Sequence, residues 1–176
     1  MPQKLTLEDA QQSLTAHLAA KGAEIHEKYG PAFGWSQLQL MLEDRTCVRY
    51  PCEIVFDDGP LRDGEFAHPV AKGEDPESGY TLYVHPFFAT QPAAVPALVL
   101  YQLVLVNYGD FASPDDAEIF GSAVLGLPRE EYYEQLCGMA DLVSQGVATM
   151  EPVEEHSGCG CSGGGCHGGG TCGCGS

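Results

Sequence analysis

The chain has 176 residues, of which 44% are hydrophobic, and its 25 acidic and 8 basic residues give a formal net charge of −17. This length and apolar content suffice for one domain with its own core. A surface so negative repels phosphate backbones and anionic lipid, so we expect neither nucleic acid nor a membrane surface as a partner.

The first 14 residues contain no apolar run, which indicates that no secretory signal peptide is present. The longest apolar stretch, 93–106, is interrupted by Pro96 and Gln102 and is too short to span a bilayer. We therefore predict a soluble, cytoplasmic protein. In that reducing compartment, clustered cysteines serve more often as metal ligands or redox groups than as disulfides.

In the first third of the chain, hydrophobic spacing predicts a helix that begins with a capping box at Thr6 and ends at Gly30. Residues 36–42 alternate like a strand, although a short helix fits them equally well. Residues 47–56 read as a strand that ends at the turn Asp57–Pro60.

Two shorter strands are predicted at 65–70 and 80–84. A helix over 92–108 is apolar nearly all round, so it should be central and covered on several sides. Two further helices begin at Ser113 and at Pro128, each with acidic residues in its first turn. The pattern predicts an α+β fold with a small mixed or antiparallel sheet packed with about four helices.

The chain divides by composition into three parts. Residues 1–148 form the predicted globular α+β domain, 149–156 an acidic linker, and 157–176 a tail of glycine and cysteine. The tail contains no large apolar side chain and cannot build a core, so we expect it to be disordered.

The tail carries five of the eight cysteines together with a histidine. Thiolates are soft ligands suited to zinc and copper(I). Five thiols and one imidazole exceed a single tetrahedral zinc shell, whereas a copper(I)–thiolate cluster could use every sulfur. We predict that this cluster binds a soft metal ion, zinc or copper(I), through Cys159, Cys161, Cys166, His167, Cys172 and Cys174.

The run Thr81–Pro86, followed by Pro92 and Pro96–Leu100, resembles the edge strand and the start of the catalytic helix in SprT-like zincin metallopeptidases. That resemblance implies a zincin-like fold. The family continues the helix as H-E-L-x-H, whereas this chain has Tyr101–Leu105. In that motif the two imidazoles bind zinc and the glutamate activates the water that attacks the substrate, so the resemblance implies a scaffold without its zinc or its base. Glu118, near the family's third ligand, would bind nothing tightly alone.

The segment Cys159–Gly163 and the pair Cys166–His167 resemble a shortened SEC-C zinc motif, without its intervening basic residues. Inside the domain, His68 and His85 each precede a proline. With Glu118 they would form a metal site if the fold joined them, but hydrogen-bonding roles in turns are favoured. The three remaining thiols are predicted to be buried and unreactive: Cys47, Cys52 and Cys137.

These features favour a non-catalytic metal-binding accessory protein, for delivery, storage or sensing, whose domain docks onto a protein partner. Three alternatives stay open. In the first, the tail is a low-complexity extension that binds metal only adventitiously. In the second, the tail is the core of a ribosomally made modified peptide, since its glycine-flanked Cys, Ser and Thr resemble substrates of azoline-forming enzymes. In the third, the domain is a metallopeptidase-like enzyme with an atypical site.

Overall fold

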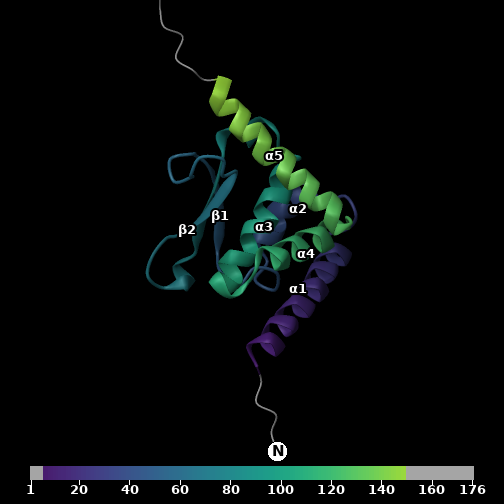
Figure 1. Ribbon diagram of the computed structural model, residues 1–176. Coiled ribbons are helices and arrows are strands. Elements are labelled where there is room, and N and C mark those ends of the chain that lie inside the picture. Colours follow the sequence, from purple (N-terminus) through teal and green to yellow (C-terminus); the bar gives the residue numbers. More distant parts are fainter. Residues whose placement is uncertain (1–5, 150–176) are drawn as a thin grey trace, which may run out of the picture.

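The computed structural model describes residues 6–149, with side chains described for 6–146. This part has the predicted α+β architecture, with the sheet on one side and the helices on the other (Figure 1). The order of elements is α1 (Leu7–Tyr29), α2 (Trp35–Glu43), β1 (Cys52–Phe56), β2 (Ala67–Ala71), β3 (Tyr80–Val84), α3 (Val95–Tyr108), α4 (Pro114–Leu125) and α5 (Arg129–Thr149), with short 3-10 turns at Pro76–Ser78, Pro86–Thr90 and Gly109–Phe111.

The described strands form one mixed sheet in the order β1-β3-β2. β3 runs parallel to β1 and antiparallel to β2, so that Leu82 lies opposite Ile54 on one side and Pro69 on the other. The resemblance placed 81–86 at the edge of the sheet, and this placement was wrong. β3 is the central strand, as its nearly continuous burial requires, and β1 and β2 form the edges.

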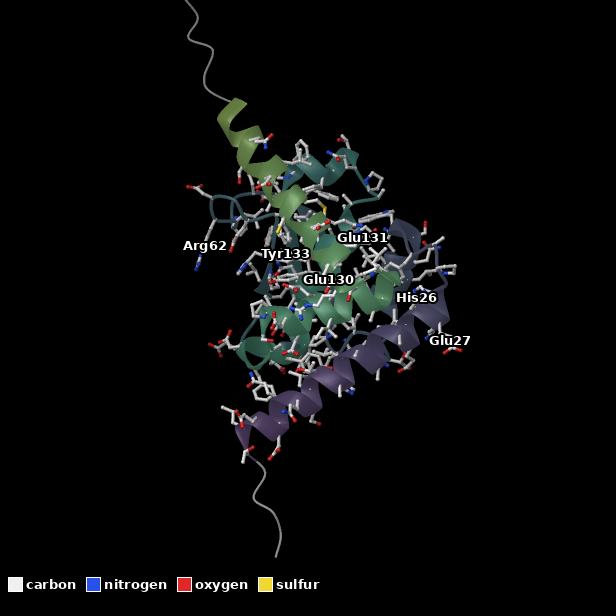
Figure 2. All side chains as sticks on the ribbon, turned by 45° about the vertical axis from the view of Figure 1, so that its right-hand side comes forward. His26, Glu27, Arg62, Glu130, Glu131 and Tyr133 are labelled. Atoms are coloured by element: carbon white, nitrogen blue, oxygen red, sulfur yellow. The ribbon has the colours of Figure 1, made fainter. Side chains whose placement is uncertain are left out.

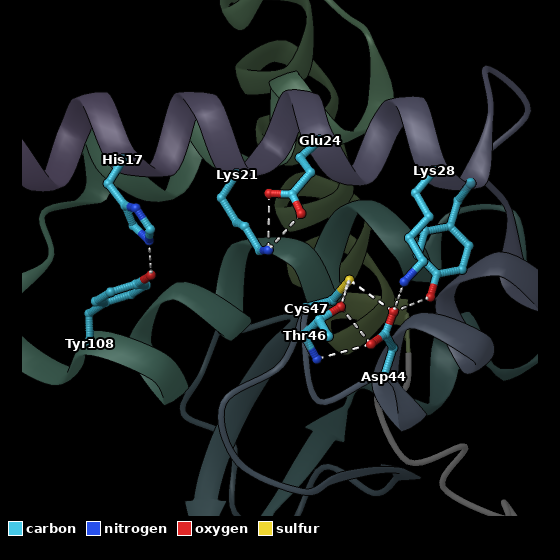
Figure 3. A network of polar contacts seen from close by, with 9 residues as sticks. His17, Lys21, Glu24, Lys28, Asp44, Thr46, Cys47 and Tyr108 are labelled. Carbon is cyan, nitrogen blue, oxygen red and sulfur yellow. Dashed lines mark hydrogen bonds and ion pairs between the residues drawn. The ribbon is translucent and has the colours of Figure 1, made fainter.

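The segment before β1 differs from the predicted strand over 47–56, because its first residues form a turn. The carbonyl oxygen of Asp44 accepts hydrogen bonds from the backbone nitrogens of Cys47 (2.9 Å) and Val48 (3.0 Å). The Asp44 carboxylate accepts from the backbone nitrogen of Thr46 at 2.9 Å and pairs with Lys28 of α1 (Figure 3). Pro51 has no N–H to give to a ladder, so pairing starts only at Cys52.

Residues 35–43 form helix α2, the alternative that alternation had left open, so the described part has five helices rather than four. Its buried residues, Leu38 and Met41, lie one helical turn apart and face the core. Alternation over so few residues does not separate a strand from a one-sided helix.

Helix α3 is the centre of the domain, as predicted. Ten of its 14 residues are buried. It packs against the sheet, α4 and α5, while α1 packs along α4 (Figure 1). Gly22 of α1 allows that last approach, because a Cβ atom there would lie 2.6 Å from Cβ of Ala123. Within residues 6–149, no helix combines the length and apolarity needed to cross a membrane.

Candidate functional site: a pocket beside helix α3

The six predicted tail ligands, Cys159 to Cys174 with His167, lie outside the described residues, as does the linker beyond Thr149. Within residues 6–149, no group of three or more His, Cys, Asp or Glu side chains is placed to hold a metal ion. His68, His85 and Glu118 are therefore not brought together. Nδ1 of His85 accepts a hydrogen bond from the backbone nitrogen of Phe87 at 3.2 Å, which confirms the predicted role in a turn for this residue. The same prediction was wrong for His68, which lies within β2 opposite Tyr83.

The three cysteines of the domain occupy different environments. Cys47 is buried, and its thiol donates a hydrogen bond of 3.3 Å to Asp44. Cys52 is half-buried, and burial raises the pKa of its thiol to about 11. Cys137 is exposed on α5, so the prediction of a core thiol was wrong there. Its neighbours Leu136 and Met139 take the inward positions of the helix.

A pocket of about 390 Å³ lies between α3, α5 and the segment that leads into β2. That volume is in the range of small-molecule sites. The lining residues come from α3, α4, α5 and the segment 64–67. The lining residues are Gly64, Glu65, Phe66, Ala67, Tyr101, Gln102, Leu105, Glu118, Tyr133, Leu136, Cys137 and Ala140.

Three positions that the zincin resemblance singled out share this pocket. The resemblance would equate Tyr101 and Leu105 with the family's two histidines and put Glu118 near its third ligand; all three residues line the cavity. The strand that contributes to the pocket lining is β2, which begins at Ala67, and no residue of β3 is among the lining residues.

Gln102 is the polar residue of the pocket floor. Only 6% of its surface is exposed, and its Oε1 atom is buried with no hydrogen-bond partner among the described residues. A buried amide oxygen without a donor is rare in folded proteins, because burial removes its water without replacing it. The atom has almost no accessible surface, so a donor from outside the chain would reach it only after the Gln102 amide turned toward the pocket.

The acidic wall of the pocket is held by a cation from α5. Nε of Arg129 donates a hydrogen bond of 2.8 Å to Glu118, and its terminal nitrogen pairs with Asp115 at 2.6 Å. A second hollow beside these residues shares Glu118 and Tyr133 with the pocket and adds Glu130. Figure 2 shows Glu130 and Tyr133 on α5. Arg129 is thus already engaged by two carboxylates.

The tyrosines of the pocket keep their protons at neutral pH. Burial raises the pKa of Tyr101, and the negative charges of Glu118 and Asp115 raise it further. A hydrogen bond with Cys137 raises the pKa of Tyr133. Both hydroxyls can therefore donate or accept hydrogen bonds, and the pocket is equipped for binding through apolar surface and a few polar atoms.

Comparison with protein-family models, with curated proteins and with solved structures found no match to this chain. In the sequence, Gln102 stands out only as an interruption of an apolar run. A polar residue inside an otherwise apolar central helix was the one available signal for the pocket, because its walls come from segments far apart in the chain.

Proposed function

We propose that the protein is a non-catalytic accessory protein that binds zinc or copper(I) through its C-terminal cysteines and histidine. The observation that carries the proposal is the density of soft ligands in residues 157–176, where five thiols and an imidazole fall within 16 residues, from Cys159 to Cys174. Glycines between them let a short chain wrap an ion. Binding and ordering of this segment are then one event.

Within the part of the chain that the structure describes, the thiols of the domain are not grouped into a metal site, which supports assigning metal binding to the tail. Cys47, Cys52 and Cys137 are in three different settings, one buried, one half-buried and one exposed. The acidic residues that follow Arg129 raise the local concentration of cations near the tail without selecting among them. In this proposal the domain provides the surface through which a protein partner is docked.

Elemental analysis tests the proposal on protein purified under reducing conditions. The full chain is compared with a chain that ends at Glu155 and with a full chain whose five tail cysteines are changed to serine. A matched control, Cys137→Ser, removes an exposed thiol from the domain. We expect metal to be lost from the first two variants and retained in the control. Equal metal content in all four proteins would overturn the proposal.

The composition of the tail also favours a second candidate, the core of a modified peptide. Glycine-flanked cysteine, serine and threonine are the residues that azoline-forming enzymes cyclise with loss of water, and residues 157–176 contain all three. Intact mass of the protein from its native host tests this candidate. Losses of water confined to 157–176 would support it, and an unmodified mass would contradict it.

We further propose that the domain is a zincin-type scaffold that lacks its metal. The proposal is supported by the shared pocket of Tyr101, Leu105 and Glu118. Its test is a rebuilt site, Tyr101→His with Gln102→Glu and Leu105→His, in a chain that ends at Glu155. If the scaffold is of this type, the folded variant gains one zinc ion, and adding Glu118→Gln weakens its binding. A folded variant that binds no zinc contradicts the proposal.

A further inference from the structure

The pocket beside α3 has a polar floor that lacks a partner. Oε1 of Gln102 can only accept hydrogen bonds, it is buried, and no described residue donates to it. Gln102 lies on α3 between Tyr101 and Leu103 and is 6% exposed. This atom has almost no accessible surface, so a ligand in the pocket meets it only when the Gln102 amide turns toward the cavity, and that ligand must then present an N–H or O–H group.

The charged groups around the pocket favour a donor that is positively charged. Glu65 and Glu118 are the charged lining residues, and both are acids. Arg129 lines the adjoining hollow and is its basic lining residue. Its guanidinium group already forms ion pairs with Asp115 and Glu118, so it is not free to bind an anion. An anionic ligand would meet carboxylates and an unpaired amide oxygen, so the pocket disfavours it.

The remaining surface of the pocket is apolar and aromatic. Leu105 and Leu136 offer aliphatic surface from α3 and α5, and Phe66 contacts the ring of Tyr101 edge-on, with centroids 6.2 Å apart. Tyr133 adds a third ring at the mouth. Aromatic faces attract organic cations, and aliphatic walls bind the body of such a ligand.

We propose that this pocket binds a small organic cation whose ammonium or guanidinium group donates hydrogen bonds to Gln102 and whose apolar body lies against Phe66, Leu105 and Leu136. The pocket's lining residues do not include any of the predicted tail ligands, so the proposal does not rest on metal binding. Its volume of about 390 Å³ holds a molecule of modest size rather than a folded partner.

Three probes of similar size test which polar group the pocket prefers: 2-phenylethylamine carries an ammonium group, 2-phenylethanol a hydroxyl group and 3-phenylpropanoate a carboxylate. Each is titrated into the 15N-labelled full chain at about 150 mM salt, which screens nonspecific attraction to an acidic surface. We expect the amine to shift amide signals of residues 64–67, 101–105 and 133–140 in a saturable way. The alcohol should bind about 10-fold more weakly and the carboxylate should not bind.

Gln102→Leu removes the buried acceptor and keeps the side chain's size. We expect it to weaken binding of the amine by about 10-fold, while Gln135→Leu, the same change on the exposed face of α5, leaves binding unchanged. If Gln102→Leu does not fold, Gln102→Met replaces it. Glu118→Gln should lower the preference for the amine over the alcohol.

Three results would overturn the proposal. One is equal affinity for the amine and the carboxylate, or no saturable shift with any probe, which would leave only water at Gln102. Another is shifts spread over the acidic surface without a focus on the pocket. The third is unchanged amine affinity in a folded Gln102 variant. None of these results bears on metal binding by the tail, which is measured separately.

Discussion

The hydroxyl group of Thr15 donates a hydrogen bond of 2.6 Å to Oδ1 of Asp116 and so joins α1 to the first turn of α4. Oδ2 of the same carboxylate accepts from the backbone nitrogen of Ser113 at 2.9 Å and from its hydroxyl at 2.8 Å. Asp116 is 1% exposed. Burial by itself raises the pKa of this carboxyl, but the hydrogen bonds from Thr15 and Ser113, with the charge of Arg129, outweigh it and leave the pKa below its usual range.

Asp116 should therefore make stability depend on pH in the acid range. A carboxyl whose pKa is lower in the folded chain than in the unfolded chain stabilises the fold above its unfolded pKa of about 3.9. This contribution is lost as pH falls from about 5 through the folded pKa. We expect Asp116→Asn to unfold at lower urea concentration than the wild type at pH 7, with a difference that shrinks toward pH 3.

The same substitution at exposed Asp58 provides the control for this prediction. Asp58→Asn should leave the urea midpoint nearly unchanged across the same range. A difference between Asp116→Asn and the wild type that grows on acidification would contradict the assigned direction of the pKa.

Gly22 should be intolerant of a side chain because α1 and α4 meet there. A Cβ atom at this position would lie 2.6 Å from Cβ of Ala123 and 2.9 Å from the carbonyl oxygen of Phe120. Overpacking of this kind costs about 1–3 kcal/mol. We expect Gly22→Ala to lower the free energy of urea unfolding by that amount.

Gly138 is the matched control, since it lies inside α5 and a Cβ atom there would meet nothing within 4 Å. Gly138→Ala should stabilise the protein by about 0.5–1 kcal/mol, because alanine loses less backbone freedom on folding. If both substitutions shifted stability in the same direction, helix propensity rather than the contact would govern Gly22.

Tyr132 anchors α5 to α3 through a buried hydroxyl. Its oxygen donates a hydrogen bond of 2.7 Å to the carbonyl oxygen of Ala97, and its ring fills the space that a Cβ atom on Gly121 would need. Tyr132→Phe keeps the ring and removes only this bond, so we expect a loss of about 0.5–1.5 kcal/mol in urea unfolding. Tyr132→Ala should lose about 3–5 kcal/mol, as large core truncations do. Similar losses for both variants would mean that the hydroxyl, rather than the ring, dominates.

Most helices could be predicted from the sequence because their ends carry local chemistry. Thr6 and Ser113 cap α1 and α4 with the expected reciprocal bonds to Asp9 and Asp116. The strands were harder to place. The turn that Asp44 holds before β1 depends on a partner in α1, Lys28, which no local pattern indicates. Likewise, the central place of β3 follows from pairing between distant segments.

The candidate pocket could not be predicted from the sequence either, because it too is formed by segments far apart in the chain. Tyr101, Glu118 and Tyr133 come from three different helices, and only the packed fold makes them neighbours. Gln102 was visible as a polar residue in an apolar run, but a partner for it elsewhere in the fold was equally compatible with the sequence. The predicted metal ligands, Cys159 to Cys174, stay a prediction, because they lie outside the described residues.

The three domain cysteines should differ in their reactivity in the native protein. Cys137 is exposed, Cys52 is half-buried with its pKa raised to about 11 by burial, and burial also raises the pKa of Cys47. The thiolate is the nucleophile, and with a pKa near 11 only about one Cys52 thiol in a thousand is ionised at pH 8. We expect iodoacetamide at pH 8 to label Cys137 at least about 10-fold faster than Cys52 or Cys47, as read by peptide mass spectrometry of the full chain.

Labelling in 8 M urea is the control, since unfolding should bring the three rates together. The labelling rate of Cys52 should rise as pH increases from 8 toward 10, because its thiolate fraction grows over that range. Labelling of Cys52 as fast as Cys137 in the folded chain would contradict the burial of β1 against the rest of the domain.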